Sequence, residues 1–194
     1  MKTFSKPLLS ELTVLTNNLL RIAETQFLTM PKDALYRRPR PDAWSVAECL
    51  EHLAIYGDYY LSVIRQKISE KKDLPLQPIF QSGWLGEYFV RMIRLKNGVS
   101  AKKMKTKNSY NPLKQGRVRE NVVQVFIQQQ KEMLELLQIS HHTNLEKIRV
   151  PISIAPFLTI KLGDAFRFVI YHNERHIAQA EKAKAATFVG SLVV

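Results

Sequence analysis

Residues 162–185 read LGDAFRFVIYHNERHIAQAEKAKA, a pattern that predicts one long helix. Its two histidines, His172 and His176, are four residues apart. Side chains at that spacing lie one above the other on the same face of a helix, with Cβ atoms roughly 5–6 Å apart. Two imidazole nitrogens on one tetrahedral zinc ion lie about 3.3 Å apart, because each Zn–N bond is about 2.0–2.1 Å long. One helix can therefore supply two ligands to a metal ion.

The third ligand that the sequence offers is His52. Ser45 and Glu48 form an S-x-x-E capping box, which begins a helix, and His52 lies one turn further on, at the edge of the predicted core. Three histidines from two helices would leave one coordination position open, as in catalytic zinc sites. The alternative is a pair with one buried and one exposed histidine and no metal. His141 and His142 instead lie at a helix end, where a cation can bond to free carbonyl groups.

Apolar residues at steps of three and four predict three further long helices. They cover about residues 5–27, the stretch that follows the capping box, and about residues 118–139. A short helix over residues 84–95, which Gly98 could close, is predicted within the long connection before the third of the four long helices. We therefore predict an all-α fold, a four-helix bundle with a long, basic crossover containing that short helix between helices 2 and 3.

Two connections carry further expectations. The crossover is long enough for the second and third helices to run parallel. Residues 148–160 are the only strand-like segment, no strand hairpin is predicted, and Thr159 is expected to lie in the cap region of the last helix.

Length and composition indicate one globular domain over residues 1–194, with 45% hydrophobic and 24% charged residues. A chain of this size needs no disulfide or structural metal to fold. The lone cysteine, Cys49, excludes an internal disulfide and fits a reducing compartment. No apolar run of about 18 residues occurs, and the N-terminal residues are too polar for the core of a signal peptide. We expect a cytoplasmic protein with no membrane span.

Positive charge is concentrated between Arg91 and Arg119, which contains ten lysines and arginines and no acidic residue. Such a segment can attract nucleic acid, an anionic surface or an acidic ligand. It is also typical of a solvated loop. Proteins that bind single strands usually add stacking aromatic residues, and only Tyr110 is interleaved with the basic residues from Lys96 onward. At most weak, non-specific binding of nucleic acid is expected.

Several catalytic motifs are absent. HNERH is not the H-E-x-x-H motif of zinc proteases, because Glu174 lies about 200° around the helix from His172 and projects away from a shared metal. The sequence contains no Gly-rich phosphate loop and no G-x-S-x-G motif. Cys49 lies one turn before His52, so it is either a fourth ligand or a small packing residue.

Four polar residues are candidates for the surroundings of the metal. Tyr56, Tyr59 and Gln130 either line a pocket or pack and cap within the fold. Gln179 lies one turn after His176, where it either holds the imidazole as an outer hydrogen-bond partner or remains at the surface.

Two motifs resemble the DinB/YfiT-like superfamily: WSVAECLEHL at residues 44–53 and YHNERHIAQAEKAK at residues 171–184. The resemblance spans most of the chain and has the same order, with one histidine on the second helix, a long crossover, and H-x-x-x-H on the last helix. It implies a four-helix bundle, a divalent metal (often zinc or nickel) on His52, His172 and His176, and frequent dimers. Family members are described as metal-dependent hydrolases. Some relatives transfer low-molecular-weight thiols such as bacillithiol, and others isomerise maleylpyruvate with a thiol cofactor.

Two functions follow from these observations. The first is a metal-dependent enzyme, a hydrolase or thiol transferase, in which metal-bound water or a small thiol attacks a small electrophilic substrate. No acidic general base can be assigned, since Asp58 is six residues from His52 and off its face, so the catalytic residues and the substrate stay open. The alternative is a stress-response protein that binds nucleic acid or an anionic surface through residues 91–119, with a structural or vestigial metal site.

Overall fold

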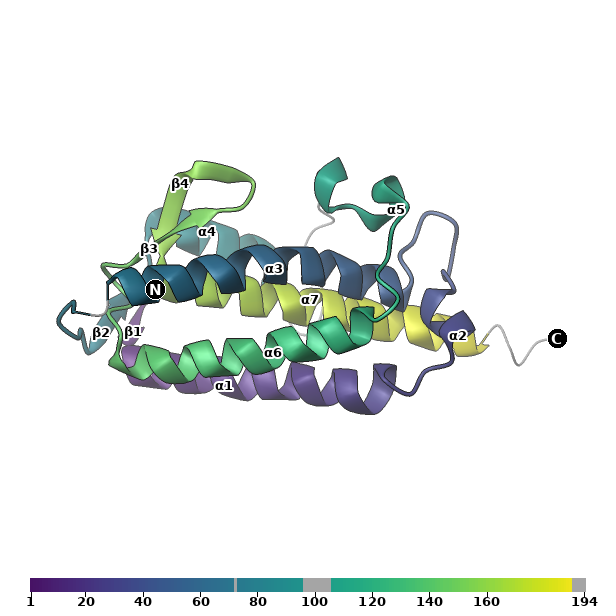
Figure 1. The fold of residues 1–194 in the computed structure, drawn as a ribbon, viewed down its shortest axis with the longest axis horizontal. Coiled ribbons are helices and arrows are strands. Elements are labelled where there is room, and N and C mark those ends of the chain that lie inside the picture. Colours follow the sequence, from purple (N-terminus) through teal and green to yellow (C-terminus); the bar gives the residue numbers. More distant parts are fainter. Residues whose placement is uncertain (72, 96–105, 190–194) are drawn as a thin grey trace.

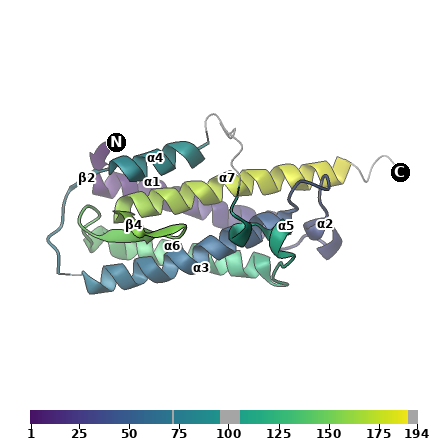
Figure 2. The same ribbon diagram turned by 90° about the horizontal axis from the view of Figure 1, so that it is seen from above.

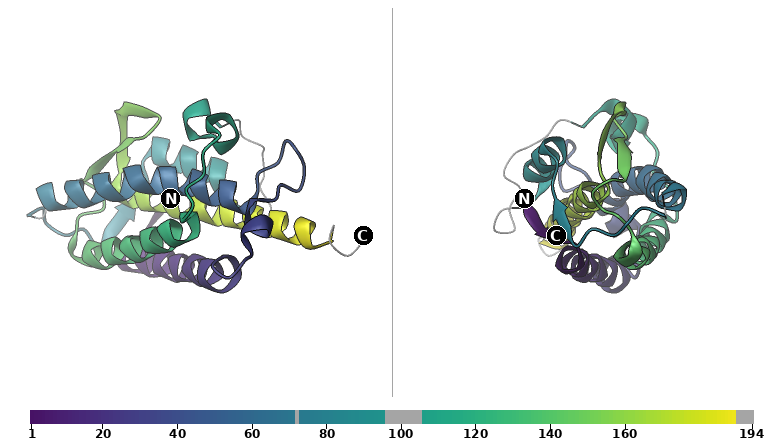
Figure 3. Two further views of the ribbon diagram at one scale, coloured as in Figure 1. Left: turned by 45° about the vertical axis from the view of Figure 1, so that its right-hand side comes forward. Right: turned by 90° about the vertical axis from the view of Figure 1, so that its left-hand side faces the viewer.

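The computed structural model describes residues 1–71, 73–95 and 106–189. Its four longest helices in these ranges are α1 (Ser5–Ile22), α3 (Val46–Glu70), α6 (Val122–Ile139) and α7 (Leu162–Val189). Helix α3 packs against α6 and α7, and α1 packs against the same two helices. The end-on view in Figure 3 shows the four helices around a common axis. The described chain is mostly helical, as predicted.

The helix directions follow from the connections. Figure 1 shows α3 and α6 running in one direction and α1 and α7 in the opposite one. The long connection between α3 and α6 lets these two helices run parallel. Helix α1 continues into a π-helical turn, η1 (Ala23–Phe27), so the predicted helix over residues 5–27 is present. The short helix α2 (Lys32–Tyr36) was not predicted.

The start of α3 is fixed by the predicted capping box. The Glu48 N–H donates to Ser45 Oγ at 3.2 Å, and the Ser45 N–H donates to Glu48 Oε2 at 2.8 Å. The guanidinium of Arg38 donates two further hydrogen bonds of 3.0 Å from Nε to the Glu48 carboxylate. Burial alone would raise the pKa of Glu48, but these bonds hold it below its usual value. The helix therefore begins at a defined residue, which fixes the direction in which His52 projects nearly two turns later.

The expectation of no strand hairpin is wrong. Strands β3 (Arg149–Ile152) and β4 (Ala155–Lys161) pair antiparallel, with Val150 opposite Ile160. Val150, Ile152 and Ile160 are buried, so alternate side chains face the helices. Pro151 makes β3 hard to recognise as a strand in the sequence, because proline has no N–H to donate to a neighbouring strand. The register of the pair shifts beside it.

The remaining boundaries differ from the prediction in local ways. Thr159 lies in β4 rather than in a helix cap, and α7 begins at Leu162, whose N–H donates to the carbonyl of Ile148. Strands β1 (Lys2–Phe4) and β2 (Ile79–Gln81) form a second antiparallel pair that was not predicted.

Helix α6 begins at Val122, four residues later than expected. The backbone before Val122 forms hydrogen bonds with other segments instead of with the helix. The Arg119 N–H donates to Glu51 Oε2 at 3.0 Å, and the Arg119 carbonyl accepts from the Tyr36 hydroxyl at 3.1 Å.

Within the crossover, the predicted short helix is α4 (Trp84–Ile93), which lies alongside α7 (Figure 2). Gly98, its expected stop, lies outside the described residues. Further short helices are η2 (Asn108–Tyr110), α5 (Pro112–Gln115) and η3 (Ser140–His142).

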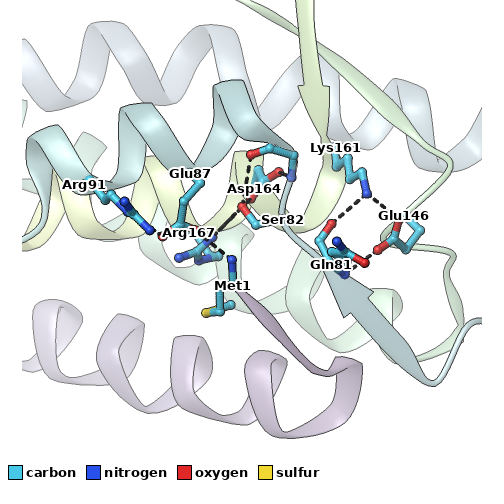
Figure 4. A network of polar contacts seen from close by, with 10 residues as sticks. Met1, Gln81, Ser82, Glu87, Arg91, Glu146, Lys161, Asp164 and Arg167 are labelled. Carbon is cyan, nitrogen blue, oxygen red and sulfur yellow. Dashed lines mark hydrogen bonds and ion pairs between the residues drawn. The ribbon is translucent and has the colours of Figure 1, made fainter.

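A buried polar network joins α4 to the first turn of α7 (Figure 4). Arg167 is 1% exposed and Asp164 is 0% exposed. The Arg167 Nη1 donates to Asp164 Oδ1 at 3.2 Å and to Glu87 Oε2 at 3.0 Å. Asp164 also accepts from the Gly83 N–H at 2.8 Å, and a Cβ atom on Gly86 would lie 2.3 Å from its carboxyl carbon. Glycine is therefore needed where α4 crosses this carboxylate.

Within the described residues, no helix is both long enough and apolar enough to cross a membrane.

Candidate metal centre

The structure brings His52, His172 and His176 together between α3 and α7. Their side chains are buried, with exposed fractions of 2%, 6% and 9% for the three residues. One ring nitrogen from each lies within 4.8 Å of the other two. Within the described residues, this is the only group of histidine, cysteine or acidic side chains with that spacing. The alternative of one buried and one exposed histidine on α7 is wrong, since both are buried.

Hydrogen bonds fix the proton positions of two of these histidines. The Nδ1 of His52 lies 2.6 Å from the carbonyl oxygen of Tyr110. The Nδ1 of His176 lies 3.0 Å from Oε1 of Gln179. Both oxygens can only accept, so each Nδ1 carries the proton and each Nε2 keeps its lone pair. That is the state in which Nε2 can bind a metal ion.

The third histidine provides a test of whether a metal fits. The Nε2 atoms of His52 and His172 are 3.2 Å apart, close to the roughly 3.3 Å expected for two ligands of one tetrahedral zinc ion. Because His52 Nε2 holds a lone pair, the metal-free pair needs the proton of His172 on Nε2. His172 Nδ1 is a buried nitrogen without a hydrogen-bond partner among the described residues, whichever ring nitrogen holds the proton. A cation in place of that proton satisfies all three Nε2 lone pairs, so the donor set fits a divalent metal.

Burial keeps the imidazoles neutral. It lowers the pKa of His52 to about 4, despite the opposing hydrogen bond to the Tyr110 carbonyl. Burial, with repulsion from the neighbouring histidines, lowers the pKa values of His172 and His176 well below the usual 6.5. At pH 7 the three rings are therefore in the form that binds metal.

These pKa shifts predict acid sensitivity of the metal-free protein. Protons bind the unfolded histidines near pH 6.5 but bind the folded ones only at lower pH, so stability falls as the pH drops below 6.5. Each histidine that stays neutral contributes a loss of up to about 1.4 kcal/mol per pH unit. Glu87, whose pKa is lowered to about 2, loses its contribution only below about 4.5. Urea unfolding between pH 7 and pH 4.5 measures the histidine effect.

The control for this measurement is His142→Gln, because His142 is exposed at the end of α6. That variant is expected to keep the pH slope of wild type, whereas His172→Gln should reduce it by about one proton. A free energy of unfolding that is constant from pH 7 to pH 4.5 would contradict the prediction.

Aromatic rings surround the three histidines. Trp44 stacks on His176, with ring centroids 5.6 Å apart, and Phe168 stacks on His172 at 5.8 Å. The ring of Tyr56 lies 4.5 Å from that of His172. Trp44 and Phe168 were not predicted as neighbours of the site. Phe168 could have been identified, because it lies four residues before His172 on the same helix face.

The other predicted residues divide into those near the histidines and those with different partners. Tyr56 and Gln179 contact them directly, as described above. Tyr59 contacts the edge of Tyr60, at 5.1 Å between centroids, and Gln130 accepts from the Asn173 amide at 3.2 Å. Cys49 is buried in the apolar core, and burial raises the pKa of its thiol. Cys49 is outside the metal-ligating group, so the packing role fits it.

Residues outside the predicted site also have defined places. Asp58 accepts from Arg119 Nη2 at 2.6 Å, and Glu51 Oε1 forms an ion pair with Arg119 Nε at 3.2 Å. Both of these carboxylates are thus engaged in ion pairs with Arg119. His141 lies with His142 in η3, outside the metal-ligating group.

One comparison with known proteins bears on this arrangement. The family model of the DinB superfamily matches residues 15–180, a range that includes all three histidines. No curated protein and no solved structure matches the chain significantly. The match covers most of the 194 residues and agrees with the resemblance carried by the two sequence motifs. The chain belongs to the DinB superfamily.

Proposed function

We propose that this protein is a metal-dependent enzyme of the DinB type, in which His52, His172 and His176 hold a divalent metal ion, zinc or nickel, within a four-helix bundle. The observation that carries the proposal is the pair of Nε2 atoms 3.2 Å apart, one of them committed to a lone pair by the Tyr110 carbonyl. A buried pair of this kind is costly unless a proton or a cation lies between the nitrogens.

Bound metal would supply Lewis-acid chemistry, either by lowering the pKa of a water molecule towards about 7 or by holding a small thiol as its thiolate. The chain contributes orientation and exclusion of water. The Tyr110 carbonyl and Gln179 fix two imidazole rings, while Trp44, Phe168 and Tyr56 cover the histidines with apolar surface. A low local dielectric strengthens the electrostatic contacts of the site. A small electrophilic substrate suits such a site, in a reaction of hydrolysis or thiol transfer. We also propose that the protein forms a homodimer, as the resemblance to the family implies.

The basic segment gives the alternative function less support. Three of its four arginines pair with carboxylates of the same chain: Arg91 with Glu87, Arg94 with Glu11, and Arg119 with Asp58. Lys107 donates to a backbone carbonyl. These charges are partly neutralised within the molecule, which leaves fewer of them to contact phosphates. Lys96, Lys102, Lys103 and Lys105 lie outside the described residues.

The proposed function is tested by metal analysis followed by two assays. Untagged protein is purified, its metal content is measured, and it is reloaded with Zn²⁺ or Ni²⁺. Hydrolysis of a p-nitrophenyl ester is then compared with conjugation of a small thiol to a chromogenic electrophile. Turnover that needs the metal and disappears in His172→Ala supports the proposal. If the protein holds stoichiometric metal but shows neither activity, the metal site is structural rather than catalytic. If the protein retains no metal after reloading, the proposal is overturned.

Gln179 gives a narrower prediction. Outer partners of metal-bound histidines typically contribute about 10–100-fold to metal affinity, so Gln179→Ala should weaken Zn²⁺ binding by that factor. The metal-free stability should change little, because Gln179 is only half-buried. Affinity is measured by competition with a chelator. Gln26→Ala is a matched control, since this half-buried glutamine also bonds to a side chain of α7, Glu181, away from the histidines. If Gln179→Ala and Gln26→Ala bind Zn²⁺ with equal affinity, Gln179 is an ordinary surface residue with no role in metal binding.

A further inference from the structure

The basic crossover returns to the metal centre before it enters α6. Residues 106–116, which we term the strap, contain η2 and α5. Figures 1 and 3 show the strap and the β3–β4 hairpin rising from the same side of the molecule, above α3. The strap contacts α3 through η2 and α5. A segment predicted as a solvated loop is therefore packed over the helix that carries His52.

The strap presents one unused backbone carbonyl to His52. In a continuing helical turn, the Tyr110 carbonyl would accept from the N–H of residue 113 or 114. The Leu113 N–H instead donates to the Asn111 side chain at 3.1 Å, and the Lys114 N–H donates to the Asn111 carbonyl at 2.9 Å. Pro112 has no N–H at all. The Tyr110 carbonyl is thus left free to accept the 2.6 Å hydrogen bond from His52 Nδ1.

Side-chain contacts hold this carbonyl in place. The Tyr110 hydroxyl donates to the Ser153 carbonyl at 3.2 Å, and Lys107 Nζ donates to the Ile154 carbonyl at 3.0 Å. Ser153 and Ile154 form the turn between β3 and β4. The Ser153 N–H in turn donates to the Tyr60 hydroxyl of α3 at 3.3 Å. These hydrogen bonds form a continuous chain of contacts. The chain connects Tyr60 of α3 to the hairpin turn, the hairpin turn to Tyr110, and Tyr110 to His52 of α3.

We propose that Tyr110 is a positioning residue for His52, and that the β3–β4 turn supports it. This inference rests on the proposed metal site. A backbone carbonyl is a common outer partner of a metal-bound histidine, because it fixes the tautomer and the plane of the ring. Here the carbonyl belongs to a short turn followed by a four-residue helix, which has little rigidity of its own. The ring of Tyr110, 4.7 Å from that of Tyr56, and its hydroxyl supply the missing restraint.

The experiment compares Tyr110→Ala and Tyr110→Phe with a matched control, Tyr36→Phe. Tyr36 also donates its hydroxyl to a backbone carbonyl of the crossover, that of Arg119, but the contact does not reach His52. Zn²⁺ affinity is measured by chelator competition, and the ligand geometry by the visible spectrum of the Co²⁺-loaded protein. Tyr110→Ala should weaken Zn²⁺ binding by about 10–100-fold and alter the Co²⁺ spectrum. Tyr110→Phe, which loses one hydrogen bond, should weaken it by about 2–10-fold. Tyr36→Phe should match wild type in both.

Each other outcome has a definite meaning. Unchanged affinity and spectrum in Tyr110→Ala would overturn the positioning role, and so would an equal loss in Tyr36→Phe, which would indicate a general loosening of the crossover. Failure of the wild-type protein to bind Zn²⁺ or Co²⁺ would overturn the proposed function instead. If Tyr110→Ala does not fold, Tyr110→Phe and Lys107→Met decide the question, because both keep the ring and the backbone of Tyr110.

Discussion

Protein with His172→Ala is expected to retain no zinc after dialysis against a chelator that leaves wild type loaded. The loss should exceed the about 10–100-fold typical of an outer partner, because one of three direct ligands is removed. His52→Ala and His176→Ala should behave in the same way, since each ring supplies one nitrogen to the group. Metal content by elemental analysis and affinity by chelator competition measure the effect.

The controls for this result are His141→Ala and His142→Ala. Both histidines lie in η3, outside the metal-ligating group, and their removal should leave metal binding intact. Equal loss on replacing His141 would show that the zinc is bound elsewhere. Unfolding of each metal-free variant is followed in parallel, so that loss of a ligand is distinguished from loss of the fold.

The largest effect on stability is expected for Asp164→Ala. The variant leaves the buried guanidinium of Arg167 with Glu87 as its remaining carboxylate and removes the acceptor of the Gly83 N–H. Removing one partner of a buried ion pair typically costs about 3–5 kcal/mol, because the other charge stays buried without compensation. The free energy of unfolding, measured with urea, should fall by an amount near the lower end of that range, since Glu87 stays in place.

Two variants separate charge from packing in this network. Asp164→Asn keeps the size and one acceptor oxygen, so its loss should be smaller than that of alanine. Asp42→Ala removes a carboxylate from an exposed pair with Arg40 and should change stability little, as expected for surface ion pairs. A loss as small for Asp164→Ala as for Asp42→Ala would show that the network contributes nothing to the fold.

Local signals in the sequence were sufficient for the four long helices and for the shared face of His172 and His176. The capping box at Ser45 involves residues three positions apart, and the spacing of His172 and His176 is a property of a single helix. Both can be recognised without knowledge of the fold. The placement of His52 was predictable because its helix has a definite start and a definite apolar face.

The features that were missed depend on contacts between distant segments. The Tyr110 carbonyl reaches His52 across 58 positions of the sequence, and no side-chain pattern reports a backbone acceptor. The β3–β4 hairpin was missed because Pro151 interrupts the strand pattern, although burial of Val150 and Ile160 stabilises it. The late start of α6 likewise follows from bonds between Arg119 and the distant residues Tyr36 and Glu51.

The separation of the histidines has a consequence for synthesis of the chain. His52 and His172 are 120 positions apart, so the ribosome must add those residues before two of the nitrogens can meet. At about 5–20 residues per second, that interval is roughly 6–24 s. During it, the second helix exists without the helix that completes the metal centre. An ion held by all three histidines would therefore enter a domain whose last helix has already emerged, unlike the ion of a zinc finger, which folds a short peptide around itself.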